Sequence, residues 1–329
     1  MHTIDLGKYN CRTDLVIEKK QNFSEEEHYE EKDISVDRVT ADNNKYVTIS
    51  FKDITDKDNY KNVEGIFIKE LKKFLNGYLS YNSKILVIGL GNSRSTPDSL
   101  GPKVVDNILV TAHLFNLGEV EDGYRNVCAL KPQVTGITGI ETGDIIEAVI
   151  KKLSIDLVIA VDALAALSIT RVNKTIQISD FGIAPGSGVG NNRRELSIRT
   201  LGIPVIAIGV PTIVDAATIV TDTIKYLFKH LSYKVKNIDN AKSKLINSLT
   251  FDYSKQDNIF NNDDKEKLLG IIGTLSDDEL RALFLEVLTP INYNLMVTPK
   301  EVDFMMEKMG VLIGNGINKS LHDHFNPTK

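Results

Sequence analysis

The sequence has little of several features that define classes of protein. Only two of its 329 residues are cysteines, Cys11 and Cys128, and they show no paired spacing and no Cys/His cluster. This argues against a disulfide framework or a structural zinc site and fits a reducing cytoplasm. The N-terminus has no apolar signal segment, and no aliphatic run approaches the roughly 20 residues needed to span a bilayer. We therefore expect a cytoplasmic protein without a membrane partner.

An excess of positive charge is also missing. The formal net charge is -5 and the isoelectric point is near 5.8. No general attraction to phosphate backbones follows from this balance, so nucleic acid is not expected as a direct partner, whereas a basic protein partner suits it better. Hydrophobic residues make up 42% of the chain. That share fills a sizeable core in a chain of this length, organised as one large domain or two ordinary ones.

Short aliphatic runs are the main structural signal that is present. They lie at 84–91, 156–164 and 203–211 and are nearly all apolar, as expected for strands that are buried on both faces. Helical patterns such as "GDIIEAVIKKL" lie between them. This alternation predicts an α/β fold, with a mostly parallel sheet flanked by helices. A further run at 175–180 alternates apolar and polar residues, which predicts a strand at the edge of the sheet.

The segments around these runs differ in composition. Residues 17–62 are dominated by Glu, Lys, Asp and Asn, with one strand pattern at "KYVTISF", which predicts a polar, partly ordered approach to the core. Residues 233–268 are again polar and predict a surface excursion or linker. In the C-terminal helical part, 269–329, a capping box formed by Ser276 and Glu279 marks the start of one of two predicted helices. We expect both helices to pack on the main core.

A glycine-rich loop follows the first aliphatic run, in the stretch "VIGLGNSRSTPDSLGP" at 87–102. A dinucleotide-binding loop needs a third glycine where this chain has Arg94, and the Gly-Lys-Ser/Thr of a P-loop is absent. We therefore expect no nucleotide cofactor. The glycines still predict a tight turn at the carboxyl end of a strand, which is where open α/β sheets bind their ligands.

Two aspartates stand at such strand ends. Asp98 follows Pro97 in the glycine-rich loop, and Asp162 ends the apolar run "LVIAV". When two carboxylates share a site, repulsion and desolvation keep one protonated and the other charged. Such a pair supplies the acid and the base that activate water against an amide carbonyl. The alternative for each aspartate is that it caps a helix.

Other catalytic groups have no supporting pattern. No Gly-x-Ser-x-Gly motif marks a serine nucleophile, and Cys128 has no histidine partner that the sequence reveals. The six histidines are scattered through polar termini and helical patterns, so we expect no metal site. The alternative to an enzyme is a non-catalytic, ligand-binding α/β module.

Several motifs together resemble the germination proteases of spore-forming bacteria, endopeptidases that begin the degradation of small acid-soluble spore proteins. They are "RTDLVIE", "VIGLGNSRSTPDSLGPKVVDNILVTAHLFN", "GITGIETGDII", "VIAVDALAA", "TIQISDFGIAPGSGVGNNRREL", "GIPVIAIGVPTIVDAATI" and "LMVTPKEVD". The resemblance covers the core and the C-terminal helices, whereas 17–62 and 233–268 match poorly. That family is similar in turn to the hydrogenase-maturation endopeptidases, which share its α/β sheet.

The resemblance implies an aspartic-type endopeptidase whose two essential aspartates fall on Asp98 and Asp162. It implies small acid-soluble spore proteins as substrates, a homotetramer, and a location in the cytoplasm of the spore core, whereas the expectation of no cofactor and no metal comes from the residues discussed above. Members of the family are made as zymogens that remove a short N-terminal propeptide. On this basis 1–14 is the propeptide and 15–329 is the peptidase domain.

The resemblance also locates the processing site. The family cuts after an acidic residue and before a large apolar one, and "RTDLVIE" offers Asp14 followed by Leu15. We predict self-cleavage between these two residues, which converts an inactive precursor into the active enzyme.

Two departures from the family pattern stand near these motifs. Ala184 occupies a position in "GIAPGSG" where the family has a histidine, and Ser93, Arg94 and Ser95 replace a segment that usually contains a tryptophan. The first departure argues against a metal-assisted mechanism, because the hydrogenase-maturation relatives use a histidine beside two carboxylates. A metal-recognising peptidase of that maturation type remains the alternative within the same fold.

Overall fold

A computed structural model describes residues 12–19, 21–80, 82–118, 120–186, 194–239, 256–291 and 295–323. Contacts divide the chain into two compact units. The larger unit holds the described parts of Arg12–Ala166, Thr170–Ile213 and Thr298–Lys329. The smaller holds those of Leu167–Ile169 and Val214–Val297.

The described residues form a nine-stranded sheet. Its strands are β1 (Glu25–Glu31), β2 (Ile34–Ala41), β3 (Asn44–Ser50), β4 (Lys84–Gly89), β5 (Asn126–Leu130), β6 (Leu157–Ala166), β7 (Thr175–Ser179), β8 (Val205–Asp215) and β9 (Met296–Val297). The helices are α1 (Lys57–Leu75), α2 (Leu100–Asp106), α3 (Ala112–Leu117), α4 (Thr135–Thr138), α5 (Thr142–Leu153), α6 (Ile198–Leu201), α7 (Ala216–Lys236), α8 (Asn262–Leu269), α9 (Ile271–Thr274), α10 (Asp277–Leu288) and α11 (Val302–Leu321). Short 3-10 turns lie at η1 (Val16–Glu18), η2 (Thr96–Asp98) and η6 (Thr289–Ile291).

The sheet runs in the order β1-β2-β3-β7-β8-β6-β4-β5, and β9 pairs with the end of β8. Parallel pairing joins β4 to β5 and to β6. Antiparallel pairing joins β1 to β2, β2 to β3, β3 to β7 and β7 to β8. The predicted α/β class is therefore confirmed, but the sheet is mixed.

Two expectations about the flanking strands were wrong. Residues 17–62 were expected to be a polar, partly ordered segment with one strand, at "KYVTISF". That strand forms as β3, but the described part of the segment also forms β1, β2 and the beginning of α1. The run at 175–180, expected at an edge, forms β7 in the interior of the sheet, between β3 and β8. Its alternating polar side chains are buried instead of facing water, because neighbouring segments supply their hydrogen bonds. Gln177, for example, binds the N-terminal segment at Asp14 and Val16.

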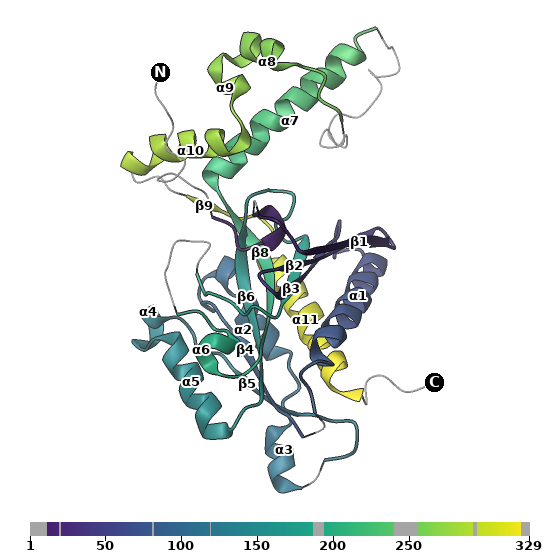
Figure 1. The fold of residues 1–329 in the computed structure, drawn as a ribbon, viewed down its shortest axis with the longest axis vertical. Coiled ribbons are helices and arrows are strands. Elements are labelled where there is room, and N and C mark those ends of the chain that lie inside the picture. The colour runs from purple at the N-terminus through teal and green to yellow at the C-terminus, as the bar shows by residue number, and fades with distance from the viewer. Residues whose placement is uncertain are drawn as a thin grey trace. The chain divides into compact units, whose positions relative to one another are not determined.

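The main core lies on one face of the sheet. Figure 1 shows α1 and α11 on this side and α5 on the other. The buried cluster takes Leu157, Ile159 and Val161 from β6 and joins them to residues of α1, α2 and α11. Side chains alternate along a strand, so the residues between these, and Asp162 after them, point toward the opposite face. The face of the sheet that packs on α1, α2 and α11 is thus apolar core, and the Asp162 side chain lies on the opposite face.

The two predicted C-terminal helices form, but the expectation that both pack on the main core holds for α11 and was wrong for α10. Helix α11 is buried in the main core through Met306, Met309, Leu312, Ile313 and Ile317. Helix α10 begins at the predicted capping box, where Ser276 and Glu279 bond reciprocally, and packs in the smaller unit with Leu285 against Ala217 of α7. No helix among the described residues is both long and apolar enough to cross a membrane.

Candidate active site

The carboxyl end of β4 is built around glycines that allow very close backbone contacts. Strand β4 ends at Gly89, and Gly91 turns the chain with a φ of +104°. A Cβ atom on Gly101, near the start of α2, would lie 2.2 Å from the carbonyl oxygen of Leu90 and 2.6 Å from that of Val161. Only glycine fits such an approach. The glycine-rich loop is therefore the predicted tight turn, and it seats the start of α2 on β4 and β6.

Asp98 is the last residue of η2, and hydrogen bonds from the glycine-rich loop hold it in place. Its Oδ2 accepts a hydrogen bond from the backbone N–H of Asn92 at 2.9 Å, and so does its main-chain oxygen at 2.9 Å. A Cβ atom on Gly91 would lie 2.1 Å from the carbonyl oxygen of Asp98. The N-cap position of α2 belongs to Ser99, so the capping alternative does not describe Asp98. Its carboxylate instead accepts the hydrogen bond from Asn92 within the glycine-rich loop.

Asp162 lies within β6 and is 5% exposed. Its Oδ1 accepts a hydrogen bond from the N–H of Ala163 at 2.9 Å. The strand continues to Ala166, so Asp162 does not cap a helix and does not end its strand. The last pair between β4 and β6 joins Gly89 to Val161. Asp162 is thus the first residue of β6 beyond the end of β4.

Two contacts join the segments that carry the two aspartates, and a third ties the Asp98 segment to β8. The N–H of Leu90 donates to the carbonyl oxygen of Val161 at 2.8 Å, and η2 contacts β6. From the next strand, the Thr212 hydroxyl donates to the carbonyl oxygen of Pro97 at 2.7 Å. Asp98 and Asp162 therefore stand on adjoining elements at the edge of the sheet where β4 ends.

The predicted processing junction is docked against the end of β6. Asp14 donates its N–H to the carbonyl oxygen of Ala165 at 3.1 Å, and its Oδ2 accepts the N–H of Ala165 at 2.9 Å. Gln177 holds the other side, donating from Nε2 to the carbonyl oxygen of Asp14 at 3.1 Å and accepting the N–H of Val16 at 2.7 Å. The Leu15 side chain is fully buried. Asp14 is thus held by hydrogen bonds to Ala165 and Gln177, whereas Leu15 is held by the burial of its side chain.

This junction lies near the strand segment that carries Asp162. A cavity of about 220 Å³ beside it is lined in part by Asp14, Leu164, Gln177 and Ala184. Ala184, one of the positions named above as departures from the resembled pattern, therefore lines the same cavity as Asp14 of the N-terminal segment. Sequence reasoning missed Gln177, and its only signal was a position among the alternating polar residues of the run at 175–180.

Within the described ranges, no group of three or more His, Cys, Asp or Glu side chains is placed to hold a metal ion. Cys128 is half-buried, and burial raises the pKa of its thiol. A raised pKa lowers the share of reactive thiolate.

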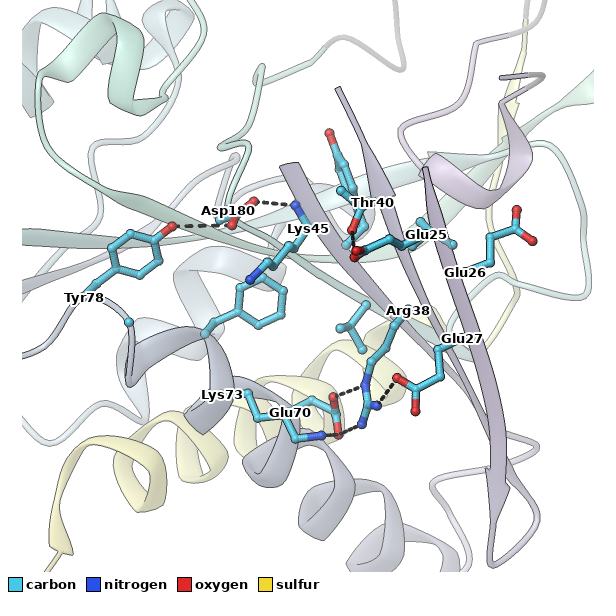
Figure 2. A pocket seen from close by; sticks show the side chains of 15 residues that line it. Glu25, Glu26, Glu27, Arg38, Thr40, Lys45, Glu70, Lys73, Tyr78 and Asp180 are labelled. Carbon is cyan, nitrogen blue, oxygen red and sulfur yellow. Dashed lines mark hydrogen bonds and ion pairs between the residues drawn. The ribbon is translucent and has the colours of Figure 1, made fainter. Parts of the chain in front are cut away.

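A second cavity, of about 610 Å³, lies beside strands β1 to β3 and the last turns of α1 (Figure 2). Among the side chains that line this cavity, Glu70 is a buried carboxylate, 1% exposed. Arg38 binds both carboxylate oxygens of Glu70 at 2.9 Å, and Lys73 donates at 3.0 Å. Burial, the largest influence, raises the pKa of Glu70, but the hydrogen bonds and charges of Arg38 and Lys73 together outweigh it and lower the pKa. This cluster joins the N-terminal strands to α1.

We expect Glu70→Gln to reduce the free energy of unfolding by about 2 kcal/mol at neutral pH, because it removes the buried charge that Arg38 binds through two hydrogen bonds and leaves the guanidinium paired with the exposed Glu27. Since the folded pKa of Glu70 is lowered, its stabilisation is present above the ordinary glutamate pKa and is lost as the pH falls through the lowered value. Urea unfolding across the acid range measures this difference. Glu307→Gln, at the exposed pair with Lys103, is the control and changes little. A difference that grows toward acid pH contradicts the assignment.

A family model and two similar proteins carry the same description. The family model described as germination protease matches residues 15–329. A germination protease of Priestia megaterium is 46% identical over 353 residues, covering 97% of this chain and 95% of the relative, and one of Bacillus cereus is 46% identical over 350 residues with the same coverage. Among solved structures, a NiFe hydrogenase maturation protease, HycI, from Thermococcus kodakarensis is similar with 19% identity and a TM-score of 0.27, covering 44% of this chain and 80% of that one.

Proposed function

The chain belongs to the germination protease family, and we propose that it is the endopeptidase that starts the degradation of small acid-soluble spore proteins, with water activated by Asp98 and Asp162. The family makes it a protease of spore germination. The observation that carries the aspartate pair is their position on adjoining elements, η2 and β6, at the edge where β4 ends. Open α/β sheets bind their ligands at this edge.

The proposed reaction needs one proton shared between the two carboxylates. The charged aspartate takes a proton from water as the water oxygen adds to the amide carbon. The protonated aspartate first donates a hydrogen bond to the carbonyl oxygen, and a proton then passes to the departing amine nitrogen. The fixed backbone contacts around Gly91 and Gly101 hold the Asp98 loop for this task.

The proposal has a direct test. The protein is incubated with a small acid-soluble spore protein, and the fragments are identified by mass. We expect cuts between an acidic residue and a large apolar one. Cuts that ignore this pattern, or none at all from processed protein, contradict the proposal.

We further propose that the precursor cuts itself between Asp14 and Leu15. The pairing of an acid with a buried apolar residue supports this site, as does the start of the family match at residue 15. Ala165, which holds Asp14, lies three residues beyond Asp162, or about 10 Å along a strand. The docked junction therefore has to slide toward Asp162 before it is cut.

We expect Asp14→Asn to slow this self-processing about tenfold, because the family cuts after an acidic residue and asparagine keeps the shape without the charge. A charge-assisted hydrogen bond made to Asp14 in the cutting position, after the junction has left Ala165, is worth roughly 1.4 kcal/mol more than a neutral one. Mass spectrometry of the precursor over time measures the rate. Asp33→Asn, in an exposed position at the β1–β2 turn, is the matched control and leaves the rate unchanged. Processing of Asp14→Asn at the wild-type rate, or at another bond, contradicts this cleavage site.

The resemblance also motivates an assembly and a location. We propose a homotetramer in the cytoplasm of the spore core. Light scattering of the purified protein measures the assembly, and a monomer at all concentrations counts against it.

A further inference from the structure

Gln133 has an unusual backbone conformation next to the candidate active site. It follows β5 and has a φ of +61°, in the left-handed region that favours glycine. Such a conformation costs a non-glycine residue about 1 kcal/mol and persists only where the surroundings fix it. Here the carbonyl oxygen of Gln133 accepts a hydrogen bond at 3.1 Å from the hydroxyl of Thr142, which is buried. The side chain of Gln133 is therefore aimed by a fixed backbone.

The side-chain oxygen of Gln133 is bound to the loop that carries Asp98. Its Oε1 accepts the N–H of Ser93 at 3.3 Å and the Ser93 hydroxyl at 3.1 Å. The preceding N–H, that of Asn92, donates to the Asp98 carboxylate at 2.9 Å. Two successive amides of one loop thus hold the Gln133 carboxamide and the Asp98 carboxylate.

The other end of the Gln133 carboxamide has no acceptor among the described residues, although its oxygen is doubly bound. The side chain is half-buried. Because the oxygen is fixed and the amide is planar, the direction of the two Nε2 hydrogens is fixed as well. A donor that is oriented in advance at the edge of an active site suits a carbonyl oxygen on which negative charge develops.

We propose that Gln133 is a catalytic residue that donates from Nε2 to the carbonyl oxygen of the bond being cut. The inference rests on the proposed peptidase function. When the water oxygen bonds to the amide carbon, the carbonyl electron pair moves onto oxygen, one proton passes from water to the basic aspartate, and Gln133 stabilises the oxyanion. Its protons stay on nitrogen throughout.

Two variants distinguish a donor role of Gln133 from support of the Ser93 loop and from an effect of charge. Gln133→Glu keeps the oxygen that binds Ser93 but adds a charge. Gln133→Met keeps the length of the side chain without the oxygen or the charge. The two variants share only the loss of the Nε2 donors. Each chain is first processed by immobilised wild-type protein, which is then removed. Steady-state cleavage of a peptide with an Asp–Leu junction gives kcat and KM. We expect kcat to fall about 100-fold in both variants, with KM within a few fold of wild type.

Every other pattern overturns the proposal. Loss in Gln133→Met alone means that Gln133 only supports the Ser93 loop, and loss in Gln133→Glu alone is an effect of charge. Normal kcat in both, or a change confined to KM, removes the donor role. Asp98→Asn is run alongside. If that variant is inactive while the Gln133 variants are normal, the donor role fails alone, and if wild-type protein does not cleave the peptide, the proposed function fails with it.

Discussion

Replacing either Asp98 or Asp162 by asparagine is expected to lower the rate of cleavage of a small acid-soluble spore protein by about 10⁴-fold, at the upper end of what one acid or base contributes. Asparagine has nearly the same size and keeps an oxygen that accepts a hydrogen bond, such as that from Asn92 to Asp98. It neither takes a proton from water nor gives one to the amine. Self-processing of the precursor is expected to stop in the same variants.

A double variant sharpens this result. If the two aspartates act as one unit, the double replacement is no slower than the worse single one, because residues that act as a unit lose their effect together. Asp106→Asn is the matched control. Asp106 is exposed near the end of α2 in an ion pair with Lys131, and we expect a rate within twofold of wild type. Proteolysis retained by either active-site variant means that another group activates the water.

The part of the fold that the sequence predicted rests on local signals. Apolar runs predicted β4, β6 and β8 because a strand buried on both faces needs apolar residues throughout. The turn after β4 was predicted because glycines mark a close backbone approach, such as that of Gly101 to Leu90. Both signals lie within a few residues of the structure that they specify.

The remainder depends on contacts that are distant along the chain. Strand β7 reads as an edge strand because its polar partners, around Asp14, lie some 160 residues earlier. Asp162 was expected to end its strand, but β6 outlasts β4 and continues to Ala166. The roles of Thr212 and Gln133 near the candidate site arise only from such pairings. The aspartates themselves were predicted because strand ends in α/β sheets meet at one edge.

Gly101→Ala is expected to damage both the fold and the candidate site. The new methyl group would lie 2.2 Å from the oxygen and 2.5 Å from the nitrogen of Leu90, and 2.6 Å from the oxygen of Val161. All three are backbone atoms, so α2 must move away from β4 and β6. We expect the free energy of unfolding to fall by about 3 kcal/mol, as in severe overpacking. Urea unfolding measures the loss.

The same displacement should reach the chemistry, because Asp98 lies three residues before Gly101 and its loop closes on Gly91. A shift of about 1 Å in a catalytic group costs on the order of 100-fold in rate, so we expect that loss even under conditions where the variant is fully folded. Gly65→Ala is the control. Gly65 is exposed in α1 with no atom within 4 Å of a new Cβ, so alanine there should add about 1 kcal/mol of stability and leave the rate unchanged. If folded Gly101→Ala keeps full activity, the position of Asp98 does not depend on this contact, and the site is more tolerant than the glycine packing implies.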